Sequence, residues 1–262
     1  MKNKLSGGIW TSFFSFVLAA VFLIQPISAL HNGWYVKRAS DNRQPKLDAG
    51  QEIIEKHGGY FIDHRHGDEC EEKVIYLTFD AGYVNENVLS ILDTLKNEKV
   101  PSAFFILDHV LKKNGDVVKR MTDEGHHVCN HTMRHKDMTK VGREEFATEL
   151  NGLADSYRNL TGREMPKYYR PPEGKYSEEN LIWAKELGYK TVFWSFAYAD
   201  WDNGAQPELT RAKKKITENL HNGAVLLLHP TSKTNALLLP ELIREWKAEG
   251  YRFGTLDELT AE

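Results

Sequence analysis

Residues 74–83 read Val-Ile-Tyr-Leu-Thr-Phe-Asp-Ala-Gly-Tyr, and this stretch decides the fold. A run of β-branched and aromatic residues that ends in a turn signal predicts a buried strand. Asp80 stands where this strand runs into a loop. In α/β folds, ligands and catalytic groups collect at that carboxyl edge of the sheet. An aspartate shortly before a helix is also a common N-cap, so the stretch alone leaves both roles open.

Strand and helix patterns alternate along the rest of the chain. Strands are expected at residues 74–80, 101–107, 127–130, 168–170, 191–196, 224–229 and 251–254. Helices are expected between them, at residues 85–98, 116–124, 143–160, 177–187, 209–220 and 237–249. This alternation predicts parallel strands covered by helices, as either a (β/α) barrel or an open doubly wound sheet. No glycine-rich phosphate loop occurs, so nothing indicates nucleotide binding.

The amino-terminal residues have the pattern of an export signal. A positively charged start, an apolar stretch at residues 9–24 and a small-residue end at Ala29 predict a signal peptide over residues 1–29. The domain would then act in the cell wall or the extracellular space. A retained membrane anchor is the alternative, because the stretch approaches the roughly 20 apolar residues that span a bilayer.

Composition bounds the remaining organisation. The 262 residues are 41% hydrophobic and 27% charged, which is typical of a globular protein. Residues 30–72 are expected to form an arm with one helix at 46–57, packed on a main domain at 73–262. The net charge of −3 gives no support for nucleic-acid binding, and no feature predicts a protein partner. Cys70 and Cys129 could form one bridge, or Cys129 could be a buried free thiol.

Four further polar clusters follow predicted strands. They are His-Thr-Met-Arg-His at 131–135, Arg-Pro-Pro-Glu-Gly at 170–174, Asp200-Trp201, and His229. If the strands are parallel, these clusters and Asp80 share one edge of the sheet, a coincidence that packing alone explains poorly. His131 and His135 are four residues apart, so on a helical turn they would share a face. This spacing suits two ligands of one divalent metal, with a carboxylate as the natural third; two surface histidines are the plain alternative.

Taken in order and with their spacing, the five clusters resemble the motifs of the polysaccharide deacetylases (NodB-like, carbohydrate esterase family 4) from residue 74 to residue 229. The resemblance implies an α/β fold, a distorted and incomplete (β/α) barrel of about seven parallel strands with covering helices. It also implies that Asp80 is the general base, Arg170 orients Asp80, His229 is the general acid and Asp200 tunes His229. His131 and His135 would bind a divalent metal, usually zinc, and Trp201 and Leu227 would form an apolar wall near the acetyl methyl group.

Ala81 departs from the family pattern. The family usually has a second acid there, which binds the metal, and alanine cannot ligate. We therefore expect weaker metal affinity, with Asp80 or water completing the shell around His131 and His135. Asp80 could not then act freely as both ligand and base. A catalytically inactive, glycan-binding domain is the alternative reading.

Further segments resemble the subgroup of muramic-δ-lactam de-N-acetylases that act on spore-cortex peptidoglycan. These segments are residues 33–38, 73–83, 192–195, 200–201 and 229–236. The implied substrate is N-acetylmuramic acid in peptidoglycan glycan strands. Tyr83, Tyr169, Trp194 and Trp201 are candidates for stacking on sugars, although the position of Trp194 within a strand favours the core for this residue. Deacetylation of N-acetylglucosamine polymers or of acetylated xylan remains the alternative activity.

Overall fold

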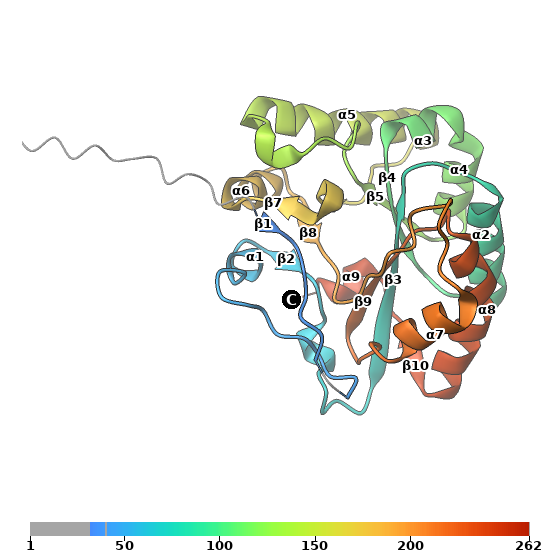
Figure 1. The fold of residues 1–262 in the computed structure, drawn as a ribbon. Coiled ribbons are helices and arrows are strands. Elements are labelled where there is room, and N and C mark those ends of the chain that lie inside the picture. The colour runs from blue at the N-terminus through green and yellow to red at the C-terminus, as the bar shows by residue number, and fades with distance from the viewer. Residues whose placement is uncertain (1–31, 40, 262) are drawn as a thin grey trace, which may run out of the picture.

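The computed structural model describes residues 32–39 and 41–261, and its centre is a curved sheet of eight parallel strands (Figure 1). The strands are β2 (Gly59–Tyr60), β3 (Lys73–Ala81), β4 (Ala103–Ile106), β5 (His127–Asn130), β6 (Tyr168–Tyr169), β8 (Lys190–Val192), β9 (Ala224–Leu228) and β10 (Tyr251–Phe253). Their order is β10-β3-β4-β5-β6-β8-β2, and β9 also pairs with β3. The predicted distorted, incomplete (β/α) barrel is confirmed, and all seven predicted strands are present.

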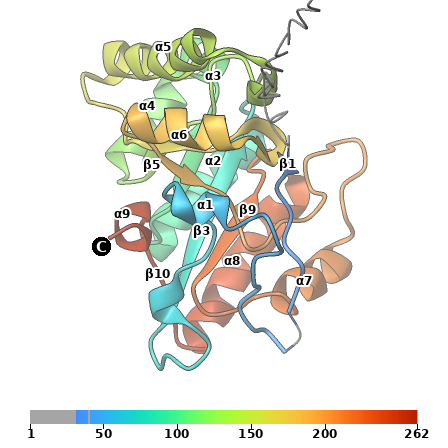
Figure 2. The same cartoon turned by 90° about the vertical axis from the view of Figure 1, so that its left-hand side faces the viewer.

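Helices cover the outside of this sheet, as the two views in Figure 1 and Figure 2 show. They are α1 (Ile53–Lys56), α2 (Glu86–Glu98), α3 (Asp108–Lys113), α4 (Gly115–Asp123), α5 (Arg143–Thr161), α6 (Glu178–Glu186), α7 (Leu209–Thr217) and α8 (Lys233–Ala248). The short helix α9 (Leu256–Leu259) packs instead against strand residues that face the barrel interior, such as Tyr76 and Phe105. A separate antiparallel pair joins β1 (Asn32–Gly33) to β7 (Lys175–Tyr176). Among the described residues, no helix is long and apolar enough to cross a membrane.

Strand β3 is the central element because it is buried from Val74 to Ala81. Its odd-numbered residues, including Phe79, belong to the large apolar cluster shared with the helices. Side chains alternate between the two faces of a strand, so Asp80 faces the opposite way, into the barrel. The cap of α2 is Asn85, whose Oδ1 accepts hydrogen bonds from two backbone amides of the first turn. Asp80 is therefore not the N-cap of this helix.

The described part of the amino-terminal arm forms part of the sheet. Strand β2 pairs in parallel with β8, so the arm contributes an edge strand as well as packing on the barrel. Its helix α1 is shorter than the helix expected at residues 46–57. A two-residue strand carries no periodic signal, which explains why β2 was not predicted. The predicted signal peptide lies outside the described residues, and the division at residue 72 stays a prediction.

Two isolated bridges bring the ends of the curved sheet together. Ile62 of the arm bridges Ala224, and Phe196 bridges Leu226, so segments next to β2 and β8 meet β9. These contacts nearly close the barrel and bring the loops after β3, β5, β6, β8 and β9 around one opening. Cys70 and Cys129 are both free, and Cys129 is buried.

Candidate active site

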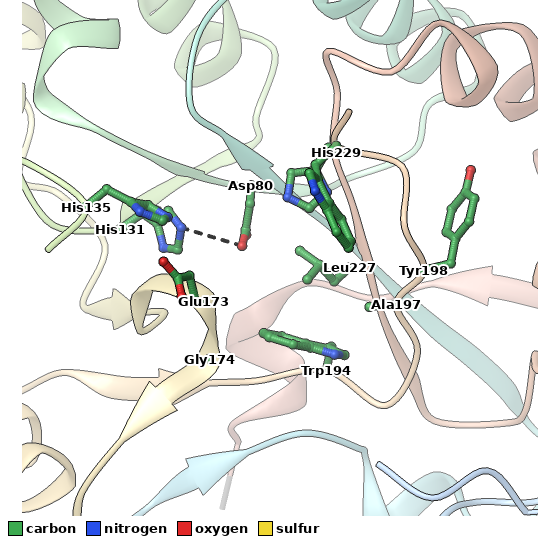
Figure 3. Close-up of a pocket in the computed structure, with 11 residues that line it drawn as sticks. Asp80, His131, His135, Glu173, Gly174, Trp194, Ala197, Tyr198, Leu227 and His229 are labelled. Carbon is green, nitrogen blue, oxygen red and sulfur yellow. Dashed lines mark ion pairs between the residues drawn. The ribbon is translucent and has the colours of Figure 1, made fainter. Parts of the chain in front are cut away.

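A cavity of about 660 Å³ opens at the carboxyl ends of the strands (Figure 3). Its lining includes Asp80, His131, His135, Glu173, Gly174, Trp194, Ala197, Tyr198, Trp201, Leu227 and His229. All five predicted polar clusters thus contribute residues to the lining. Arg170 itself does not line the cavity, because it is completely buried beneath Asp80. The volume is in the range of small-ligand pockets and is ample for a sugar with its acetamido group.

Asp80 and Arg170 form an ion pair at the floor of this cavity. The Asp80 side chain is 8% exposed, and its Oδ1 accepts a hydrogen bond of 2.8 Å from Nη1 of Arg170, which is completely buried. Burial alone would raise the pKa of Asp80, but Arg170 above all, together with the neighbouring histidines, holds it below its usual value. Asp80 is therefore a carboxylate at neutral pH, the form that can accept a proton.

The Arg170 guanidinium is fixed by more than Asp80. Nε donates to the carbonyl of Val192 at 2.9 Å, and Nη2 donates to the Thr78 hydroxyl at 2.9 Å and the Phe193 carbonyl at 3.0 Å. A buried guanidinium needs such partners, because each unpaired N–H in the interior costs free energy. Arg170 therefore has one orientation, and it orients the Asp80 carboxylate in turn.

The two predicted metal ligands lie next to Asp80. The ring centroids of His131 and His135 are 5.0 Å apart, and Nε2 of His131 lies 3.6 Å from Oδ2 of Asp80 (Figure 3). Nδ1 of His131 donates to the carbonyl of Arg170 at 2.8 Å, so the proton sits on Nδ1 and the Nε2 lone pair faces the cavity. Burial lowers the pKa of His131 to about 4, although Asp80 opposes this, so the ring is neutral.

These donor atoms fit a divalent metal in part. A neutral imidazole lone pair and a carboxylate oxygen, facing each other without a proton between them, are complementary to a cation. Across residues 32–39 and 41–261, however, no group of three His, Cys, Asp or Glu side chains converges as a complete metal site. His131 and His135 are the two side chains that would hold a metal, with water for the remaining positions.

The loops that carry these groups are strained. His131 and His135 do not lie on the expected helical turn; Thr132 and His135 both have positive φ, 71° and 55°. Glu173, in the loop after β6, has φ 55°. Positive φ is costly for residues other than glycine and persists where surrounding contacts fix the backbone. Here Asn130 and Thr132 do so, with Oδ1 accepting from the Thr132 amide and Oγ1 from the His135 amide.

His229 and Asp200 form a second polar pair across the cavity from His131. Nδ1 of His229 donates to Oδ1 of Asp200 at 2.7 Å, and Asp200 is almost completely buried. Burial would lower the pKa of His229, but the hydrogen bond and the charge of Asp200 raise it above the usual value. His229 is therefore protonated more readily than a free imidazole, and because Nδ1 is bonded to Asp200, Nε2–H carries the proton that His229 can give.

Asp80 and His229 thus have environments that push their pKa values in opposite directions. One cavity holds a carboxylate that is deprotonated and an imidazole that is more readily protonated. Two titratable groups separated in this way are suited to general base and general acid catalysis of one reaction. The geometry supports hydrolysis in which a water loses a proton on one side and the leaving group gains one on the other.

Comparisons with known proteins agree with this arrangement. The family model for polysaccharide deacetylase matches residues 67–192. The chain is 37% identical to the peptidoglycan-N-acetylmuramic acid deacetylase PdaA of Bacillus subtilis over 232 residues, which cover 87% of this chain and 86% of PdaA. The chain belongs to the polysaccharide deacetylase family. A solved structure of Bacillus subtilis PdaA, described as a family 4 carbohydrate esterase, superimposes with a TM-score of 0.82 at 35% identity, covering 88% of this chain and 97% of that one.

A second relative in the deacetylase family is named for a different sugar. The peptidoglycan-N-acetylglucosamine deacetylase of Bacillus cereus is 33% identical over 189 residues, covering 71% of this chain and 67% of that protein. The family therefore includes similar chains described for either of the two amino sugars of peptidoglycan.

Ala81 is the departure from the deacetylase pattern, and the structure shows where it lies. Its side chain is fully buried among the apolar residues that face the helices, and it does not line the cavity. Ala81 therefore offers no ligand to a metal held by His131 and His135. An acid at this position would reach the cavity only by turning around the end of β3.

Replacement of Ala81 by aspartate tests whether this position limits metal binding. We expect Ala81→Asp to bind Zn²⁺ about tenfold more tightly in a calorimetric titration, because the new carboxylate, turned around the end of β3 toward the cavity, adds an anionic ligand. Without metal the buried carboxylate should lower the melting temperature, and zinc should restore it. Ala81→Asn is the matched control for size without charge. Equal zinc affinities in the wild type and Ala81→Asp would contradict the prediction.

The predicted substrate-binding residues separate into three groups. Trp201 and Leu227 line the cavity; the Trp201 side chain is 60% exposed, and its ring lies 6.1 Å from that of His229 in an edge-on contact. Tyr83 is 45% exposed outside the cavity lining, where its hydroxyl accepts a hydrogen bond from Asn203, near Trp201 in the chain. A role for Tyr83 in binding a neighbouring sugar stays a prediction.

Tyr169 is not at the cavity, and the expectation that it stacks on a sugar is corrected. It is buried between β6 and the helices, with its ring 5.7 Å from that of Phe146. The physical reason is strand alternation: Arg170 faces the barrel interior, so the preceding residue faces outward. The period of two along β6 could have excluded Tyr169 at the outset.

Replacing Tyr169 with phenylalanine therefore should leave the chemistry intact. Its hydroxyl is buried and has no hydrogen-bond partner in the part of the chain that the structure describes, so Tyr169→Phe removes a desolvated polar group while preserving the ring. We expect acetate release within about twofold of the wild type and an equal or higher free energy of unfolding in urea. A large loss of activity without loss of stability would restore Tyr169 as a substrate-binding residue.

Two residues of the cavity wall differ from what the sequence predicted. Trp194 lines the cavity instead of lying in the core, and Gly174, at φ 67°, sits so close to its ring that a Cβ would lie 2.8 Å away. Tyr198 lines the cavity from the loop after β8. The only sequence signal for Tyr198 is its position two residues before the Asp200 motif.

Proposed function

We propose that this protein hydrolyses the N-acetyl group of N-acetylmuramic acid in peptidoglycan glycan strands, leaving an amine that can close a muramic δ-lactam. The observation that carries the proposal is that Asp80 and His229 line one sugar-sized cavity. Their surroundings lower the pKa of the carboxyl group and raise the pKa of the imidazole. The similarity to the N-acetylmuramic acid deacetylase PdaA supports the choice of sugar.

In the proposed mechanism, Asp80 takes a proton from water, and the oxygen of that water attacks the acetyl carbonyl carbon. The C–N bond then breaks, His229 gives its Nε2 proton to the leaving amine, and acetate departs. An amide has a poor leaving group, so protonation of the nitrogen is as necessary as activation of the water. Arg170 keeps Asp80 anionic, and Trp201 and Leu227 form the apolar wall for the methyl group.

The proposed cofactor is a divalent metal, with zinc as the expected ion. His131 and His135 would hold it, because both lie beside Asp80 and the lone pair of His131 faces the cavity. Bound there, the metal supplies Lewis-acid stabilisation of negative charge on the carbonyl oxygen. Residue 81 adds no ligand, so we expect the affinity to be lower than in deacetylases with an acid at that position.

Export is also part of the proposal, since peptidoglycan lies outside the cytoplasmic membrane. Residues 1–29 have the composition of a signal peptide. The mass of the protein recovered from the culture medium or wall fraction would distinguish cleavage after Ala29 from a retained anchor. A sporulation role rests on the sequence resemblance to the enzymes of spore-cortex peptidoglycan.

The deciding experiment is mass spectrometry of peptidoglycan fragments after incubation with the purified, zinc-loaded protein. Loss of acetyl from muramic acid supports the proposal, whereas loss from glucosamine selects the activity described for the Bacillus cereus relative. Acetate release from acetylated xylan but not from peptidoglycan would point to a different polymer. No acetate release from any of these, together with measurable glycan binding, would identify a non-catalytic glycan-binding protein.

A further inference from the structure

The Asp200 carboxylate accepts three hydrogen bonds, and one comes from a residue with no role in the mechanism so far. Its Oδ1 accepts from Nδ1 of His229, and its Oδ2 accepts from the backbone amide of His229 at 2.9 Å. Oδ2 also accepts from Nδ2 of Asn235 at 2.6 Å. Asn235 belongs to the segment after His229 that resembles the muramic-lactam subgroup.

Asn235 is itself held in one orientation. It is 2% exposed in the first turn of α8, and its Nδ2 also donates to the carbonyl of His229 at 3.1 Å. Its Oδ1 accepts a hydrogen bond from the Tyr198 hydroxyl. Both partners of Nδ2 are pure acceptors, so a rotated amide would place its oxygen against them and lose both hydrogen bonds.

Tyr198 adds a connection to the substrate cavity. Its ring belongs to the cavity wall (Figure 3). Its hydroxyl donates to Asn235 and so belongs to the network around Asp200. The network therefore runs from the cavity wall through Asn235 and Asp200 to His229. A fully partnered buried network of this kind fixes each member more firmly than a single pair does.

We infer that Asn235, oriented by Tyr198, is a positioning residue that fixes the Asp200 carboxylate and thereby aims His229 at the leaving nitrogen. The inference rests on the proposed function, in which His229 is the general acid. Without the Asn235 donor, Oδ2 of Asp200 loses a short hydrogen bond and the carboxylate can rotate about its terminal torsion. His229 would follow, and a displacement of about 1 Å at a reacting group can cost 100-fold in rate.

The first test is Asn235→Ala in the full-length, zinc-loaded protein. We expect kcat for acetate release to fall about 10- to 100-fold, with KM for peptidoglycan fragments changed by less than about threefold. A structural role alone would lower the melting temperature without this split between kcat and KM. An unchanged kcat would overturn the inference.

The second test is Asn235→Asp, which keeps the shape but replaces the donor by a carboxyl group. Two carboxylates in hydrogen-bond contact share one proton at low pH, and the protonated form can still donate to Asp200. We expect near-normal kcat on the acidic side and an additional loss as that proton leaves at higher pH. The other charged groups that influence His229, namely Asp80, Asp200 and Arg170, are unchanged in this variant.

Thr234→Val is the matched control. Thr234 neighbours Asn235, is equally buried, and donates its hydroxyl to the carbonyl of Pro207 at 2.7 Å, away from Asp200. We expect a lower melting temperature with an unchanged pH profile of kcat. If the pH profile of kcat in Thr234→Val shifts as it does in Asn235→Asp, both effects come from general packing, and the inference is overturned.

Ring resonances of His229 give a readout that needs no substrate. In Asn235→Ala the NMR titration of His229 should differ from the wild type, and in Thr234→Val it should not. If the wild type releases no acetate, the proposed function fails while this titration still tests the network. Identical His229 titrations in the wild type and Asn235→Ala would remove the inference whether or not the protein is active.

Discussion

Asp80→Asn is expected to reduce acetate release from peptidoglycan fragments by about 100- to 10,000-fold, the range that a general base contributes. Asparagine has nearly the same shape and can still accept the hydrogen bond from Arg170, but it cannot take a proton from water. The affinity for glycan fragments should change little, because the cavity walls are intact. The measurements are acetate release under single-turnover conditions and fragment binding by calorimetry.

A second buried carboxylate provides the control for Asp80→Asn. Asp63 is 2% exposed and lies near the amino-terminal end of β9, away from the cavity lining. Its carboxylate accepts hydrogen bonds from Arg65 and is also hydrogen-bonded to the His66 ring. Its pKa is lowered to about 2, because these partners outweigh burial. Asp63→Asn should lower the melting temperature while leaving the activity per folded molecule unchanged. Wild-type acetate release by Asp80→Asn would eliminate Asp80 as the base.

Arg170→Met is expected to produce the largest loss of stability, because it leaves the Asp80 carboxylate buried without its partner. Breaking one side of a buried ion pair typically costs about 3–5 kcal/mol in the free energy of unfolding. The carboxylate relieves part of this cost by binding a proton, so the pKa of Asp80 should rise and acetate release at neutral pH should fall by at least about 100-fold. Urea unfolding and the pH profile of acetate release measure the two effects.

The double variant Asp80→Asn/Arg170→Met separates the ion pair from the rest of the network. Removing both charges should recover part of the lost stability relative to Arg170→Met, as a double-mutant cycle would show. Recovery should be incomplete, since the carbonyls of Val192 and Phe193 still lose their guanidinium donor. If the two substitutions are simply additive, the ion pair does not hold Asp80 in the manner described.

Much of the fold was readable from the sequence because strand and helix periods repeat with little interruption. Strand β3 shows this best, since its apolar run and its closing turn signal both survive in the structure. Strand β2 was not readable, because two residues have no period and its pairing with β8 depends on residues about 130 positions away. The sequence therefore predicted the barrel but not how its amino-terminal edge is completed.

The site divides in the same way. Asp80, His229 and Arg170 were predictable as polar groups after apolar strands, which parallel pairing must bring to one edge. The backbone conformation at Thr132 and His135 was not predictable, because a left-handed conformation has no sequence signal when the residue is not glycine. Contacts such as Asn235 with Asp200 join a helix start to a distant loop, so only the folded arrangement reveals them.

The pairing of β10 with β3 has a consequence for biosynthesis. Residues 251–253 complete the parallel ladder of the strand that begins at Lys73, so the longest strand in the described sheet lacks one neighbour until these residues have left the ribosome. Closing so large a loop costs more entropy than closing a short one, and parallel sheets of this type fold slowly. We therefore expect this edge of the sheet to form after the more local pairs of β3 with β4 and of β4 with β5.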